Sequence, residues 1–181
     1  MAYYVRKIAR AKWSLLDPNS KDIIENYRAD TIANDLKTTG NTLSFWKSES
    51  LDEDVVEPIV LINSLMGDNI KTIDLLFVPD TMMSSYELNP VDGDTVLEDY
   101  RKLHYNLIRL SVGRLLGFAD DVVLKMLSSA EKHPELVRRL KEREQLIMIC
   151  KWIDDGKLNF EKLKDGQKND VMEFQRKHWL K

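Results

Sequence analysis

The stretch TIDLLFVPD, at residues 72–80, constrains the fold of this chain more than any other part of its sequence. Its apolar side chains are nearly continuous and stop at Pro79, and they are Ile73, Leu75, Leu76, Phe77 and Val78. A run of this kind is typical of a β-strand that is covered on both faces of its sheet. The stretch therefore predicts a strand deep in the core.

A second strand and a helix precede this run along the chain. Residues 42–47, TLSFWK, alternate Leu43 and Phe45 with their neighbours at the period of a half-buried strand. Between the two predicted strands, the apolar side chains of residues 59–66 recur at helical spacing. Strand, helix and strand in this order predict a βαβ unit, in which residues 42–47 and 72–78 are parallel neighbours.

The chain before residue 42 adds a strand and a short helix. Residues 3–8 are dense in β-forming side chains, which predicts a strand. Residues 29–37 place Ile32, Ala33 and Leu36 on one side of a short helix. We therefore expect a small mixed sheet that contains the βαβ unit.

The second half of the chain has helical spacing. An apolar stripe over residues 96–110 predicts a long helix that ends near Gly117. Pro134 is placed to begin a further helix, and Gly156 is placed to end it. The sheet is therefore expected to pack against a C-terminal helical layer.

These segments predict an α+β fold with a single domain over residues 1–181. Its N-terminal α/β half covers residues 1–90, and its helical half covers residues 91–181. Within the helical half, Gly113 and Gly117 have the spacing of small residues that let two helices pack closely. We expect this pair to permit helix packing.

Charge and cysteine content limit the classes of protein to consider. The net charge is −3, and neither half has the strong positive charge that sequence-independent nucleic-acid binding needs. The single cysteine, Cys150, lies in the apolar run LIMICKWI and is expected to be a buried thiol in a reducing compartment. No apolar stretch reaches the roughly 18 residues of a membrane span. We expect a cytoplasmic protein without membrane contact.

Residues 32–46, IANDLKTTGNTLSFW, resemble the helix-turn-helix of bacterial repressors. The residues at that family's spacing are Ala33, Leu36, Thr42, Leu43 and Ser44. The pattern departs at the turn glycine, because Lys37 stands there and Gly40 comes later in the chain. The resemblance implies DNA binding through residues 31–46, whereas the alternation of residues 42–47 favours a helix followed by a strand.

Motifs for catalysis or metal binding are missing from the sequence. It has no glycine-rich phosphate loop and no serine elbow, and His104, His133 and His178 are too far apart for a zinc motif. The acidic side chains of residues 80–99 miss the EF-hand spacing and match turns and helix starts. We assign no metal, cofactor or catalytic residue, and His104 stays a weak general-base candidate on a predicted helix.

Residues 79–94 have no periodic pattern, and a connection of this length in a compact domain is more often functional than accidental. Met82, Met83 and Tyr86 offer adaptable thioethers and an aromatic ring, which suit a protein-binding surface. Trp46 is a further contact candidate. In the competing interpretation, the loop folds back onto the core.

The sequence therefore favours a non-catalytic interaction or regulatory accessory protein of a bacterial or phage-like system. Its partner would be another protein or a second copy of the chain. One alternative is a motif-poor enzyme whose site lies at the C-terminal ends of the parallel strands, near Trp46 and Asp80. The other is a DNA-binding protein that uses residues 31–46. Substrate and partner are not identified by any motif.

Overall fold

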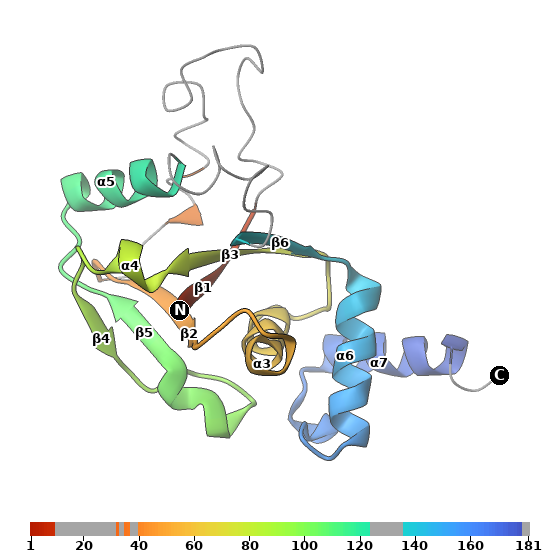
Figure 1. The fold of residues 1–181 in the computed structure, drawn as a ribbon. Helices are drawn as coiled ribbons and strands as arrows, with labels where there is room; N and C mark the ends of the chain where they lie inside the picture. Colours follow the sequence, from red (N-terminus) through yellow and green to blue (C-terminus); the bar gives the residue numbers. More distant parts are fainter. Residues whose placement is uncertain (10–31, 33–34, 37–39, 124–135, 179–181) are drawn as a thin grey trace, which may run out of the picture.

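The computed structural model describes residues 1–9, 32, 35–36, 40–123 and 136–178. Within these ranges the chain forms a six-stranded sheet flanked by helices, so the predicted α+β class is confirmed (Figure 1). The strands are β1 (Tyr3–Ile8), β2 (Leu43–Ser48), β3 (Ile73–Pro79), β4 (Leu88–Pro90), β5 (His104–Leu107) and β6 (Val137–Leu140). Their order is β4-β5-β2-β1-β3-β6, and each neighbouring pair is antiparallel.

Strand β3 lies inside the sheet and is buried from Ile73 to Val78, as its apolar run predicts. Successive side chains of a strand point to opposite faces, so Leu75 and Phe77 lie on one face and Leu76 and Val78 on the other. Figure 1 shows helix α3 on one side of the sheet and helix α5 on the other. Both faces of β3 therefore need apolar side chains.

The predicted βαβ unit is wrong in one respect. Strands β2 and β3 run in the same direction, because each is antiparallel to β1, but β1 lies between them. Tyr3 of β1 pairs with Ser48 of β2 on one side and with Pro79 of β3 on the other. The sheet is therefore antiparallel rather than mixed. The pattern of residues 3–8 predicts a strand but not its partners, which lie far along the chain.

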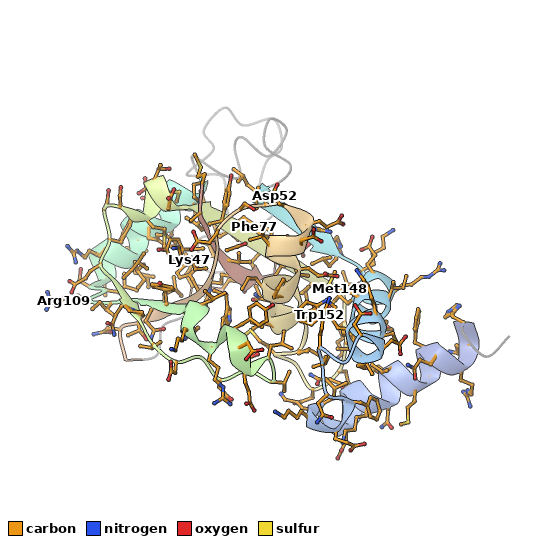
Figure 2. All side chains as sticks on the ribbon, turned by 60° about the horizontal axis from the view of Figure 1, so that its bottom comes forward. Lys47, Asp52, Phe77, Arg109, Met148 and Trp152 are labelled. Carbon is orange, nitrogen blue, oxygen red and sulfur yellow. The ribbon has the colours of Figure 1, made fainter. Side chains whose placement is uncertain are left out.

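The helices form layers on the two faces of the sheet. They are α3 (Glu53–Ser64), α4 (Asp80–Met83), α5 (Val112–Val122), α6 (Glu142–Asp154) and α7 (Asp165–His178), with short 3₁₀ helices η2 (Glu98–Leu103) and η5 (Phe160–Lys162). Helix α3 packs on β1 and β2, and α6 packs against α3 and α7. Figure 2 shows Met148 and Trp152 of α6 on the side that faces α3. None of the helices in the described ranges has the length and apolar character of a membrane span.

The second half of the chain is less helical than its pattern predicts. The long helix expected over residues 96–117 is replaced by η2, β5 and the first part of α5, and β5 pairs with β2. Arg138 and Arg139, expected on a helix, lie on β6. Leu103 and Leu107 have helical spacing, but only Leu103 lies in a helix, at the end of η2. Hydrogen bonding to the edge of β2 selects a strand from His104 to Leu107. The expected helix start at residues 133–135 lies outside the described residues.

Two predictions about helix α6 and the residues that follow it are confirmed. Gly156 follows it with a φ of 70°, a left-handed conformation that favours glycine and ends a helix. Cys150 is fully buried, and burial raises the pKa of its thiol to about 11, with the nearby Asp154 carboxylate acting in the same direction. This cysteine is therefore a packing residue and a poor nucleophile.

Candidate interaction surface

The segment after β3 is more ordered than its sequence predicts, because α4 and β4 occupy parts of residues 79–94. Met82 is 7% exposed and Met83 is 1% exposed, so both thioethers belong to the core. The expectation that they form a partner-binding surface is wrong, and the competing interpretation, a segment that folds back onto the core, describes them. The pattern could not separate the two, because methionine suits both environments.

Tyr86, the third side chain expected in the partner-binding surface, contacts helix α5 and links it to the sheet. Its ring meets Phe118 of α5 edge to face, with the ring centroids 5.3 Å apart, and Phe118 meets Phe45 of β2 at 5.9 Å. The Tyr86 hydroxyl donates a hydrogen bond to Asp121 Oδ2 at 3.1 Å. Burial and this carboxylate raise the pKa of Tyr86 to about 12. Helix α5 is thus held in a defined orientation.

Helix α5 begins with a polar cap and buries one side. The Ser111 hydroxyl accepts a hydrogen bond from the backbone N–H of Arg114, which is the usual role of a serine before a helix. Phe118 and Val122 are buried and anchor the inner side. The opposite side of the helix is exposed.

The outer side of α5 is apolar. Val112 is 76% exposed and Leu116 is 52% exposed, and the two lie one turn apart. Gly113 and Gly117 lie beside them and add no polar side chain. We call this face, with Asp120 at its far end, the α5 surface: Val112, Gly113, Leu116, Gly117 and Asp120. A single exposed apolar residue needs no explanation, but a contiguous group on one helix marks a candidate interaction site.

The two glycines are not required by packing within the described part of the chain. A Cβ atom placed on Gly113 or Gly117 meets no described atom within 4 Å apart from the nearby backbone of α5 itself. The sequence indicated that their spacing suits close helix packing, but no described helix covers them. Sequence reasoning missed this surface because the predicted apolar stripe stopped at residue 110 and gave Val112 and Leu116 no role.

Trp46 and His104, the other candidates, lie together under a covering loop. Trp46 is buried, and its ring centroid is 4.8 Å from that of His104. Gly93 covers the pair so closely that a Cβ on it would lie 2.2 Å from the Trp46 ring. Trp46 is therefore not available to a partner. His104 lies on β5 rather than on a helix, and burial lowers the pKa of its imidazole.

The site expected at the ends of the parallel strands is filled by the start of β1. The Asp80 N–H donates to the Ala2 carbonyl at 3.0 Å, and Tyr3 pairs with both neighbouring strands at the same level. Open α/β sheets leave a crevice at such a position, but here β1 occupies it. The hollows between α6 and α7, at the end of α3, and between α3, β6 and α6 are not lined by Trp46, Asp80 or His104.

The helix-turn-helix expected over residues 31–46 is wrong. Leu36 N–H donates to the Ile32 carbonyl at 2.9 Å, which fits a helical turn, but residues 43–48 form β2. This strand pairs with β1 and β5, and Phe45 on it is fully buried. A recognition helix therefore cannot form over residues 43–48, and this segment cannot read DNA as a helix-turn-helix does. Ala33 and Lys37 lie outside the described residues.

Among the described residues, no group of three His, Cys, Asp or Glu side chains is placed to hold a metal ion. Comparison of the chain with models of protein families, with curated proteins and with solved structures finds no match. The fold is that of an α+β protein with a central antiparallel sheet. Its α5 surface is the feature that bears most directly on function.

Proposed function

We propose that this chain is a non-catalytic interaction or regulatory accessory protein that binds its partner through the α5 surface. The observation that supports the proposal is the exposure of Val112 and Leu116, side by side on one helix. Complete burial of a valine or leucine side chain contributes roughly 1.5–3 kcal/mol. A partner that covers both side chains therefore gains a substantial part of the binding free energy of a protein interface.

The way that α5 is held supports the same proposal. Ordering a flexible segment on binding reduces affinity, whereas a helix already in place avoids that cost. The Ser111 cap, the buried Phe118 and the Tyr86 hydrogen bond to Asp121 all hold this helix before any partner arrives. Charged Arg114 and Asp120 flank the apolar residues and can orient a partner as a polar rim does.

The expected cytoplasmic location belongs to the same proposal. Cys150 is free and fully buried, and the raised pKa of its thiol makes it slow to oxidise. A reducing compartment suits such a residue. Fractionation of cells that produce the chain tests this part, and recovery in a secreted fraction would contradict it.

The Leu116→Asp substitution tests the proposed surface. Tagged chain is purified from cells, and the recovered proteins, an untagged copy of the chain included, are quantified by mass spectrometry. At least one protein is expected to fall about tenfold or more with Leu116→Asp, since tenfold corresponds to about 1.4 kcal/mol. Met172→Asp is the matched control, because Met172 is also an exposed apolar residue, on α7.

Both variants are first compared with the original chain by urea unfolding, because the comparison needs folded protein. Their midpoints are expected to agree, since both substituted side chains are exposed. If every recovered protein remains at the same level with Leu116→Asp as with Met172→Asp, the α5 surface binds no partner and the proposal fails.

A further inference from the structure

We propose that the partner of the α5 surface is a second copy of this chain, and that two α5 helices pack antiparallel about a two-fold axis near Gly117. This inference rests on the proposed function and specifies its partner. Three features of α5 carry it: two glycines without a role in the described packing, charges placed against the helix dipole, and the symmetry of those charges about Gly117.

The glycines indicate close approach of another backbone. Glycine inside a helix costs roughly 1 kcal/mol relative to alanine, and α5 has two such residues on its exposed side. The described residues leave open space for a Cβ atom at both Gly113 and Gly117. Glycine allows two backbones to come close together, so a second helix laid on this side would use both positions.

The charges of α5 are the reverse of those that stabilise a lone helix. Anions are favourable near a helix N-terminus and cations near its C-terminus, but α5 has Arg114 in its first turn and Asp120 in its last. The ion pairs among the described residues include neither Arg114 nor Asp120. An antiparallel second α5 would bring its acidic end to Arg114 and its basic end to Asp120.

The positions of these charges match a two-fold axis. Arg114 and Asp120 lie at equal distances along the helix on either side of Gly117. In a two-fold interface, residue i contacts residue j while j of the first copy contacts i of the second. Antiparallel packing about Gly117 therefore brings Arg114 of each copy level with Asp120 of the other, and Leu116 of each copy lies beside the axis.

The size of α5 sets the strength of the expected dimer. An 11-residue helix is about 16 Å long, and a stable interface buries roughly 800 Å² per partner, so α5 supplies the centre of the contact. Arg109, which pairs with Glu87 at 3.1 Å, projects from the chain near the start of α5 (Figure 2) and belongs to the rim. We expect a reversible dimer with a dissociation constant in roughly the micromolar range.

Charge reversal tests the arrangement. Sedimentation velocity of the full chain across roughly 1 to 300 µM, a range that brackets a micromolar constant, is expected to show a dimer. Arg114→Glu alone and Asp120→Arg alone should each weaken it at least about tenfold, because like charges then face each other twice. An equimolar mixture of these two variants should dimerise again, since each supplies the charge that the other lacks.

Two controls separate this result from general effects of charge or folding. Arg176→Glu changes the net charge by the same amount on α7 and should leave the dimer unchanged. Gly117→Leu should keep the chain folded, because a Cβ there meets no described atom, but should weaken the dimer about tenfold or more by keeping the helices apart.

The outcomes also separate this inference from the proposed function. A chain that stays monomeric throughout the range, or single variants that dimerise as the original does, would overturn the inference. If the chain is monomeric but Leu116→Asp releases a different protein, the proposed function stands and the self-association fails. If Leu116→Asp releases nothing and no dimer forms, both fail.

Discussion

Tyr86 shows how one side chain can link three elements. Its ring lies on Phe118, which lies on Phe45, and its hydroxyl reaches Asp121 at the far end of α5. The neutral hydroxyl donates this hydrogen bond, so ionisation would place two negative charges together. The position of α5 therefore depends on Tyr86 keeping its proton.

The Tyr86→Phe variant should reveal this dependence through pH. At pH 8 we expect a loss of roughly 0.5–1.5 kcal/mol in the free energy of unfolding, as for a typical hydrogen bond. The folded-state pKa of Tyr86 is about 12 and the usual value is 10. The stabilisation is thus complete below pH 10 and is lost as pH rises toward 12, because only the unfolded chain releases this proton in between.

Urea unfolding of both proteins at steps from pH 8 to pH 12 measures the difference. Tyr4, whose pKa is raised by burial, is present in both proteins, so its effect cancels. A difference that stays constant over the whole range would show that Tyr86 does not titrate as described.

Among the secondary-structure elements, α7 is joined to α3 through one buried amide. Gln167 Nε2 donates to the Leu65 carbonyl at 2.8 Å and to the Gly67 carbonyl at 2.5 Å, and its Oε1 accepts from the Lys164 N–H at 3.1 Å. Helix ends leave carbonyl groups without partners, and this side chain satisfies them at the end of α3. The contact between the two helices is therefore polar as well as apolar.

Gln167→Leu should lower the free energy of unfolding by roughly 1–3 kcal/mol, because it leaves buried carbonyls without donors. Urea unfolding measures the change. Asn169→Leu serves as the control, since Asn169 is exposed on the same helix, and its effect should stay within about 0.5 kcal/mol. Equal effects of the two substitutions would show that the Gln167 hydrogen bonds add no stability.

For the whole molecule, the sheet makes the two halves of the chain interdependent. Strands β5 and β6 come from the second half and pair with β2 and β3 of the first. Without them, β2 and β3 would each have an open edge, and the face under α3 would lose α6. This pairing supports the proposal of a single domain over residues 1–181.

A fragment of residues 1–90 tests that proposal. It should show no cooperative unfolding transition, whereas the full chain should show one transition by both circular dichroism and tryptophan fluorescence. Fluorescence is informative because Trp46 and Trp152 are buried in different halves. A fragment that unfolds cooperatively would show that the first half is a domain of its own.

Local sequence patterns predicted those elements whose buried residues recur at regular spacing along the chain. The run in β3, the alternation in β2 and the glycine after α6 were all read correctly, because each depends on a few neighbouring residues. The pattern failed over residues 104–107, where apolar spacing fits a helix but the open edge of β2 selects a strand. Hydrogen bonds to a distant partner decided that conformation.

The candidate site was harder to predict than the fold. Met82 and Met83 were expected at a surface and are buried, whereas Val112 and Leu116, which lie just beyond the predicted apolar stripe of residues 96–110, are exposed. Methionine, valine and leucine each occur both in a core and at an exposed position, so the residue type alone does not decide between the two. Which side of a helix is covered depends on elements far along the chain. The local spacing of apolar residues therefore does not predict it.

The sequence by itself determined the class of fold, the buried strand β3 and the identity of several elements, because apolar period and turn residues act over short distances. Only the tertiary structure decided that β1 separates β2 from β3, that β1 fills the expected crevice, and that α5 shows an apolar side to solvent. These features depend on which distant segments meet, and that is settled by packing and pairing across the whole chain.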